Sequence, residues 1–157
     1  MKNGLAATLF APAFFAPAFF ATALFALALP AAASDRPDKL VTVVTSENAQ
    51  VQLMSMVLTT QAMGQGHPAH ILLCGPAGDM ALAEAPDSAT AGQPPMGASP
   101  QGLLKMAMDK GARVEVCAIY LPGKGADASV LIEGVTVASP PAMAGAMADD
   151  DTVVWSF

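Results

Sequence analysis

The amino-acid sequence predicts an α/β fold, a single flavodoxin-like domain with a five-stranded, mostly parallel sheet and helices on both faces. Three observations support this prediction. Runs rich in β-branched residues recur along residues 34–157, and segments with helical spacing alternate with them. Turns that contain glycine and proline separate the two kinds of segment. This alternation is typical of a parallel sheet, because right-handed crossovers place helices against its faces.

The first half of the domain contains two predicted strands and one long helix. The run Leu-Val-Thr-Val-Val-Thr at 40–45 is suited to a buried strand, and Ser46 is the expected cap of the next helix. Apolar residues follow helical spacing over 49–63, before two glycines end the helix. The apolar run at 69–73 predicts a strand that leads into a Cys-Gly-Pro turn at 74–76.

The second half contains three further strands, and two of its helices begin with Ser-Pro, a capping residue followed by a first-turn proline. In chain order, the expected elements are a short helix at 79–84, a surface loop at 85–100, a helix from 100 to about 110, a strand at 114–120, a turn at 121–127, a helical turn at 128–132, a strand at 135–138, a helix at 140–147 and a terminal strand at 152–157.

Residues 1–33 have the pattern of a secretory signal peptide. After Lys2 no charged residue occurs before Asp35, and residues 5–29 consist almost wholly of alanine, leucine and phenylalanine. The small residues at 31–33 are suited to a signal-peptidase site. A retained membrane anchor is the alternative, because about 20 apolar residues span a bilayer. Two prolines within the stretch favour cleavage, which predicts a periplasmic protein whose domain covers residues 34–157.

The domain at 34–157 is acidic. It holds six lysines and arginines against thirteen aspartates and glutamates, a formal charge of −7. Such a surface repels phosphate backbones and anionic lipids, so nucleic acid is not an expected partner. Contact with a membrane is expected only if the leader is retained.

The predicted carboxyl edge of the sheet brings the candidate site residues together. In the order 2-1-3-4-5, taken by analogy with flavodoxin, that edge presents Ser46, Cys74 and Gly75 as candidate binding residues, together with residues 117–121. Two cysteines in an exported protein normally form a disulfide. In this order, however, the first strand separates Cys74 from Cys117, and two strand spacings amount to about 9.6 Å. Because a disulfide requires Cα atoms within about 7 Å, this order does not favour one.

Cys117 is the candidate catalytic residue. A thiol at a strand's carboxyl end can meet helix N-termini, whose partial positive charge favours the thiolate. A thiolate there can attack a persulfide and hold its sulfur as Cys-S-SH. A buried structural role is the alternative for Cys117 and also for Cys74. The sequence has no phosphate loop, dinucleotide-binding glycine motif, serine nucleophile elbow or Cys-x-x-Cys, so no cofactor is expected.

Methionine and histidine leave periplasmic copper binding open as a weaker hypothesis. Nine methionines follow residue 33, and thioethers suit Cu(I). Met54 and Met106, however, fall in predicted helices, where packing in the core is expected. His67 and His70 flank the start of a strand and are expected to be solvated loop residues. No metal site is therefore predicted.

Several stretches of the chain resemble DsrE/DsrF-like proteins. The segments 40–46, 49–66 and 71–75 (Ile-Leu-Leu-Cys-Gly) resemble the opening of those proteins. The segment Gly-Ala-Arg-Val-Glu-Val-Cys-Ala-Ile-Tyr-Leu at 111–121 is similar to the family's cysteine-bearing strand. The C-terminal half, ending in Asp-Thr-Val-Val-Trp-Ser-Phe at 151–157, also fits the family's order and spacing.

This resemblance implies a DsrE-like fold, a homo-oligomer and a cysteine that accepts persulfide sulfur, to which Cys117 corresponds. The sequence departs from the family at three points. It has a leader, whereas the known relay members are cytoplasmic. It also has an inserted loop at 85–100, and it has Cys74 at a position where the family more often has an apolar residue. Cytoplasmic desulfurases are not met outside the cytoplasm, so tRNA thiolation is not expected.

Two hypotheses of different kinds follow. The first is an exported sulfur carrier or sulfurtransferase-like protein that holds sulfane sulfur on Cys117, with a sulfur donor or acceptor protein or a small thiol as its partner. The alternative is a non-catalytic periplasmic binding or assembly module whose thiols are structural.

Overall fold

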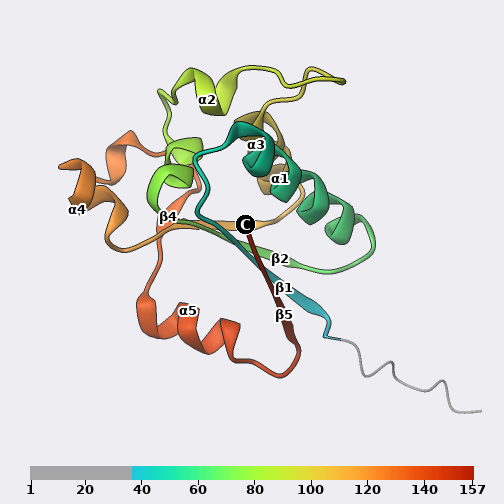
Figure 1. Ribbon diagram of the computed structural model, residues 1–157. Helices are drawn as coiled ribbons and strands as arrows, with labels where there is room; N and C mark the ends of the chain where they lie inside the picture. The colour runs from blue at the N-terminus through green and yellow to red at the C-terminus, as the bar shows by residue number, and fades with distance from the viewer. Residues whose placement is uncertain (1–36) are drawn as a thin grey trace, which may run out of the picture. The chain divides into compact units, whose positions relative to one another are not determined.

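Five parallel strands form one sheet in the computed structural model, which describes residues 37–157 (Figure 1). The predicted leader at 1–33 lies outside the described residues. The strands are β1 (Lys39–Val44), β2 (Ala69–Leu73), β3 (Arg113–Val116), β4 (Thr136–Val137) and β5 (Thr152–Ser156). The α-helices are α1 (Ala49–Gly64), α2 (Asp87–Thr90), α3 (Pro100–Asp109), α4 (Tyr120–Lys124) and α5 (Pro140–Met147), and the 3₁₀ helices are η1 (Gly75–Ala81) and η2 (Ala128–Val130). Among residues 37–157, no helix has the length and apolar character needed to cross a membrane.

The strand order is β4-β3-β2-β1-β5, with every neighbouring pair parallel. The α/β class and the five-stranded parallel sheet are therefore confirmed, but the predicted order 2-1-3-4-5 is wrong. The chain adds β2, β3 and β4 successively on one side of β1, and only β5 lies on the other side. As a result β2 and β3 are direct neighbours, with Leu73 opposite Val116 at the end of the register.

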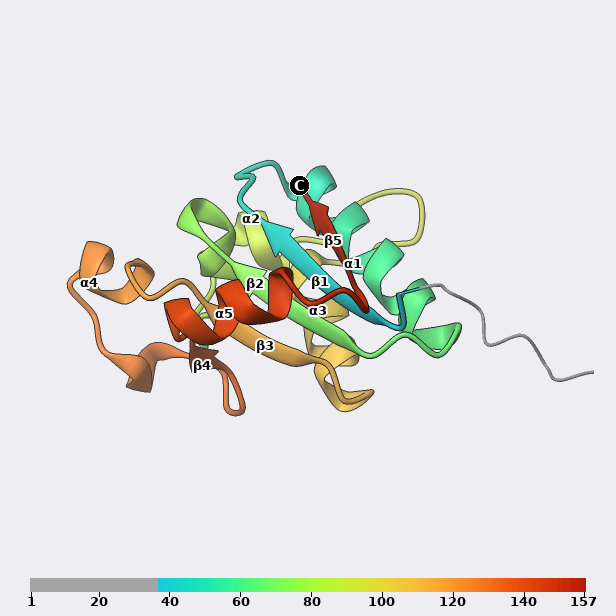
Figure 2. The ribbon, with the colours of Figure 1, turned by 90° about the horizontal axis from the view of Figure 1, so that it is seen from below.

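Helices cover the two faces of the sheet unequally. Right-handed crossovers that advance in one direction place their helices on one face, and a crossover in the reverse direction places its helix on the other. Accordingly α1 and α3 pack side by side on one face, whereas α5, which leads back to β5, lies alone on the opposite face (Figures 1 and 2). We call these the α1–α3 face and the α5 face.

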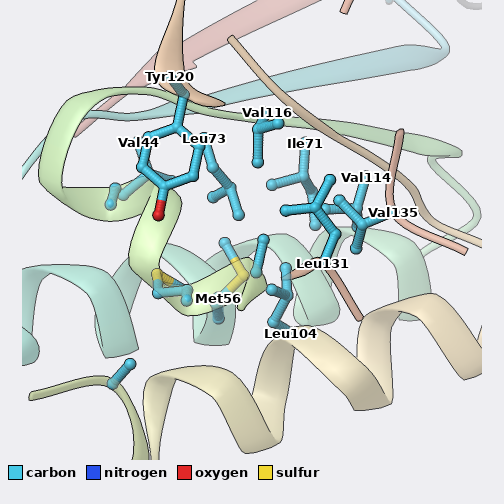
Figure 3. Packing of buried hydrophobic residues seen from close by; sticks show 14 of the residues in the cluster. Val44, Met56, Ile71, Leu73, Leu104, Val114, Val116, Tyr120, Leu131 and Val135 are labelled. Atoms are coloured by element: carbon cyan, nitrogen blue, oxygen red, sulfur yellow. The ribbon is translucent and has the colours of Figure 1, made fainter. Parts of the chain in front are cut away.

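The largest apolar core lies on the α1–α3 face. Side chains of β1, β2 and β3, including Val44, Leu73 and Val116, point toward Met56 of α1 and Leu104 of α3 (Figure 3). All five of these side chains are fully buried. Alternation along the strands turns the residues between them to the α5 face. There a smaller cluster forms around Val41, Leu72, Ala138 and Met143.

Helix α1 buries a polar side and exposes an apolar one. Its buried residues include Gln52, whose side chain donates to the Ser46 carbonyl at 2.8 Å, and Thr59, whose hydroxyl bonds to that of Thr42 at 2.9 Å. Met54 is 53% exposed, and Met106 of α3 is also exposed, so the expectation that both pack in the core is wrong. Polar residues can fill the buried side of a helix when they are hydrogen-bonded, and the spacing of apolar residues does not reveal such a side.

Several predicted boundaries differ from the structure. The third strand ends at Val116 and not at 120, because the Tyr120 N–H turns back to the Cys117 carbonyl and α4 begins. The short helix predicted at 79–84 is the 3₁₀ helix η1 at 75–81, and the loop at 85–100 contains α2. The cap of α1 is Asn48 and not Ser46, since the Asn48 Oδ1 atom accepts from the first-turn N–H groups.

Candidate functional site

The register of β2 and β3 places Cys74 opposite Cys117. The last ladder pair is Leu73 with Val116, so the next residue of each strand continues the same row. The Cys117 N–H extends the β2–β3 ladder by donating to the Leu73 carbonyl at 2.9 Å. The Cys74 N–H extends the β1–β2 ladder by donating to the Val44 carbonyl, also at 2.9 Å. The two Cα atoms are 5.1 Å apart. This separation is close to the ordinary spacing of neighbouring strands, about 4.8 Å.

Cys74 and Cys117 form a disulfide. The prediction that these residues lie too far apart is therefore wrong, and the cause is the strand order, since β1 does not lie between them. Both residues are half-buried at the carboxyl edge of the sheet, where ligands of open α/β sheets bind. Gly75 follows Cys74 directly and is exposed.

The segments that follow the two cysteines are fixed to each other. The Tyr120 hydroxyl donates to Asp79 Oδ1 at 2.6 Å, and Lys124 Nζ donates to the same oxygen at 2.7 Å. Burial, together with the hydrogen bond to Asp79, raises the pKa of the Tyr120 phenol, which therefore remains a donor. A Cβ atom at Gly78 would collide with the Tyr120 ring, so a glycine is required for this close approach. These contacts join η1 to α4 and hold both cysteine-bearing turns in place.

An apolar groove of about 340 Å³ lies beside Cys117 on the α5 face. Its floor includes Leu72 and Ala138, and α5 contributes Met143 and Met147 to its wall. Ile119, at the rim, is 81% exposed. Among the described residues that line this groove, none carries a charge. It therefore suits a neutral or weakly hydrated ligand.

A buried ionic cluster lies further along the same face. Glu115 is only 3% exposed and stands two residues before Cys117, on the same side of β3. Arg113 Nη2 donates to its Oε1 atom at 2.6 Å, and His70 Nε2 lies 2.7 Å from its Oε2 atom. Burial raises the pKa of Glu115, but the hydrogen bonds from Arg113 and His70 outweigh it and hold the pKa below its usual value. Glu115 is thus an ionised carboxylate inside the fold.

The predicted site residues are only partly brought together. Cys74, Gly75 and Cys117 share one corner of the sheet edge, whereas Ser46 follows β1 and its Oγ atom accepts from the Asn48 N–H at 3.1 Å. Within residues 37–157, no hydrogen bond joins Ser46 to either cysteine. Over the same residues, no group of three or more His, Cys, Asp or Glu side chains has the arrangement of a metal site.

Sequence reasoning missed the polar residues around the disulfide. His70 is not a solvated loop residue but part of β2, and it faces Glu115. The alternation of side chains along the strand at 69–73 could have predicted this position, because it puts His70, Leu72 and Cys74 on one face. The bond between Tyr120 and Asp79 gave no such signal, since it joins two turns that follow different strands.

The sequence matches no protein-family model, and the search of curated proteins gave no significant match. Two solved structures are similar in fold. The ychN protein from E. coli matches with a TM-score of 0.62 at 20% identity, over 76% of this chain and 99% of that one. MTH1491 from Methanobacterium thermoautotrophicum, described as a protein of unknown function, matches with a TM-score of 0.60 at 14% identity, over 76% of this chain and 98% of that one.

Both of these proteins have the DsrE/DsrF-like fold, so the resemblance noted in the sequence is supported at the level of the fold. The likeness covers nearly the full length of both neighbours. At these identities the likeness defines an architecture, and function depends on the residues of the site.

Proposed function

We propose that the protein is an exported carrier of sulfane sulfur, which it holds as a persulfide on Cys117. One observation carries this proposal: two half-buried cysteines lie opposite each other at the carboxyl edge of the sheet, with their Cα atoms 5.1 Å apart. Accessible cysteine pairs of this kind undergo thiol–disulfide exchange, which is also the chemistry of persulfide transfer. The DsrE-like fold supports the assignment without defining it.

Loading and unloading are two exchange steps. In the reduced protein, the Cys117 thiolate attacks the outer sulfur of a donor persulfide, a new S–S bond forms, and the donor leaves as a thiolate. The thiolate of an acceptor protein or small thiol then takes the outer sulfur from Cys117 by the same reaction. When no acceptor is present, the Cys74 thiolate attacks Sγ of the Cys117 persulfide, closes the disulfide and releases hydrosulfide. Cys74 is thus the resolving thiol, and the observed disulfide is the discharged state.

The surroundings of Cys117 suit this role. The core on the α1–α3 face and the bond between Tyr120 and Asp79 keep both cysteines in register. The uncharged groove beside Cys117 limits hydration of the outer sulfur. Export through the predicted leader is part of this proposal, because a disulfide persists in oxidising compartments such as the periplasm.

We also propose that the carrier self-associates through the exposed apolar side of α1. Val51, Met54 and Leu58 lie on one side of the helix at helical spacing and are exposed. A second copy of the chain is the expected partner. Light scattering of the purified domain tests this: Met54→Glu lowers the measured mass to that of a monomer, whereas Ala142→Glu, an exposed control on α5, leaves it unchanged.

A structural disulfide is the second candidate, favoured by the fact that the bond is closed and joins two neighbouring strands. In that case the protein is a binding or assembly module, and its cysteines contribute only stability. This candidate predicts that the reduced protein takes up no sulfur.

Intact-mass spectrometry separates the two candidates. The reduced domain is treated with polysulfide, freed of excess reagent and weighed. In Cys74→Ser, which lacks the resolving thiol, a carrier gains about 32 Da that a reductant removes, whereas Cys117→Ser gains none. The wild type, with no acceptor present, returns to the mass of the disulfide form. Equal uptake by Cys117→Ser contradicts the assignment of Cys117, and no uptake by any form contradicts the carrier.

A further inference from the structure

We infer that the closed disulfide between Cys74 and Cys117 is itself a reactant, and that its substrate is hydrosulfide. This inference rests on the proposed carrier function and extends it. The carrier then needs no persulfide donor, because hydrosulfide enters at the oxidation level of sulfide and becomes sulfane sulfur at the site. The disulfide supplies the oxidising equivalents.

The two sulfur atoms of the disulfide have different neighbours across the sheet. Extending the strand registers by one residue places Thr45, Cys74, Cys117 and Ala138 in one row on the α5 face. On the β1 side of Cys74, the Thr45 hydroxyl is held by the Phe157 carbonyl at 3.0 Å. On the β4 side of Cys117, the next residue of the row is Ala138, whose side chain is a methyl group and whose N–H continues the ladder to the Val116 carbonyl at 2.8 Å.

This asymmetry decides which sulfur is attacked. A thiolate or hydrosulfide breaks a disulfide by approaching one sulfur from the side opposite the other. For Cys117 that approach comes from the β4 side, where the groove between Ala138 and α5 lies open. Cys117 lines this groove and Cys74 does not. Hydrosulfide is small enough for the groove, and its approach meets no negatively charged side chain among the lining residues.

The step balances without a further reagent. Hydrosulfide attacks Sγ of Cys117, an S–S bond forms to that atom, and the bond to Cys74 breaks. Cys74 leaves as a thiolate, which takes up the proton of the new persulfide or one from water. The incoming sulfur loses two electrons and the disulfide gains them. The products are a persulfide on Cys117 and a thiol on Cys74, the loaded state of the carrier.

After the outer sulfur has passed to an acceptor thiolate, the protein is left as a dithiol. Exchange with an external disulfide, protein or small molecule, takes two electrons from it and closes the bond between Cys74 and Cys117 again. The full cycle therefore oxidises one sulfide to sulfane sulfur and consumes one external disulfide.

The test uses the oxidised protein, shown by mass to contain no free thiol. It is treated without oxygen with polysulfide-free sodium sulfide, alkylated and weighed. We expect a gain of about 34 Da before alkylation, one alkylated thiol at Cys74 and one alkylated persulfide at Cys117 in the fragments. A second sample, Cys74→Ser reduced and then treated with polysulfide, reports the carrier function separately, because this variant lacks the thiol that would release the added sulfur.

Two exposed alanines of α5 provide a matched pair of variants. Ala144 lines the groove and Ala142 does not, although both are exposed on the same helix. Ala144→Trp fills the approach to Cys117 and is expected to slow loading by sulfide about tenfold, whereas Ala142→Trp leaves the rate unchanged. Unfolding curves of both variants confirm that the comparison is made between folded proteins.

Each outcome decides a separate point. If reduced Cys74→Ser loads with polysulfide but the oxidised wild type takes up no sulfide, this inference is wrong and the carrier function stands. If neither form loads, both proposals fail. If sulfide loads but the persulfide lies on Cys74, or if both tryptophan variants react at the wild-type rate, the assignment of the groove as the route to Cys117 is overturned.

Discussion

The two faces of the sheet differ in what covers them and in what they contain. The α1–α3 face carries the large apolar core, in which strand residues meet Met56 and Leu104. The α5 face is covered by one eight-residue helix, and it holds the disulfide, the groove and the buried carboxylate of Glu115. One face thus holds the larger apolar core, and the other holds the disulfide and the buried charge under a lighter cover.

Truncation of one leucine on each face is the most direct test of this contrast. Leu73 is fully buried on the α1–α3 face, and its neighbour Leu72 lies beside the groove on the α5 face. We expect Leu73→Ala to lower the free energy of unfolding by about 4 kcal/mol and Leu72→Ala by about 2 kcal/mol, because the site near the groove loses fewer contacts. Denaturant unfolding measures both, and equal losses would contradict the contrast.

Opening the disulfide tests how far the α5 face depends on a covalent bond. The bridge closes a loop with a sequence separation of 43 residues, for which the chain-entropy model gives about 4 kcal/mol and measured values are often lower. We expect Cys74→Ser to lower the free energy of unfolding by about 3 kcal/mol. A reductant should lower the free energy of unfolding of the wild type by the same amount as the substitution does, and it should leave that of Cys74→Ser unchanged. A variant as stable as the oxidised wild type would show that the bond adds no stability.

The buried carboxylate makes the α5 face sensitive to acid. Because the pKa of Glu115 in the folded protein lies below its unfolded value, the stabilisation is present above the unfolded pKa. It is lost as the pH falls through the folded pKa. We expect Glu115→Gln to cost about 2 kcal/mol at neutral pH, by weakening charged hydrogen bonds to Arg113 and His70.

Unfolding curves at several pH values check this prediction. The difference in stability between wild type and Glu115→Gln should shrink as the pH falls below the unfolded value. A difference that stays constant would assign the loss to packing and not to the charge.

The contact between the two cysteine-bearing turns gives the smallest expected effect on stability. Gly78→Ala forces the Tyr120 ring to move, at a cost of about 1 kcal/mol. Tyr120 is the one tyrosine in the sequence, so ultraviolet titration reports its phenol alone. We expect ionisation above the usual pH in the wild type, because the pKa is raised, and a shift back toward the usual value in Gly78→Ala and Asp79→Asn. An unchanged titration in both variants would contradict the role of this contact.

The sequence was sufficient to predict the class of fold and most of its segments. A β-branched run located the first strand and an apolar run the second, and the Ser-Pro pairs located the starts of α3 and α5. Alternating segments do not say which strands are neighbours, however, because each crossover can advance or return along the sheet. The error in strand order is also the reason that the disulfide was not predicted.

The face of α1 was hidden for a different reason. Thr59 and Gln52 are buried because each has a specific partner, the Thr42 hydroxyl and the Ser46 carbonyl. The spacing of hydrophobic residues indicates which side chains leave water readily, but it takes no account of hydrogen-bond partners that lie elsewhere in the chain. The same limit applies to His70, which is half-buried and bonds to Glu115, a residue 45 positions away in the chain.

The pairing of β1 with β5 has a consequence for the order of events in folding. These strands are the first and the last in the sheet's chain order, and the contacts around them, such as Thr45 with Phe157, join residues 112 positions apart. Closing so long a loop is slow compared with pairing β1 to β2. We expect the outer edge of β1 to remain unpaired until synthesis has passed β5. A chain with this topology therefore completes its sheet only late, after its last strand has been made.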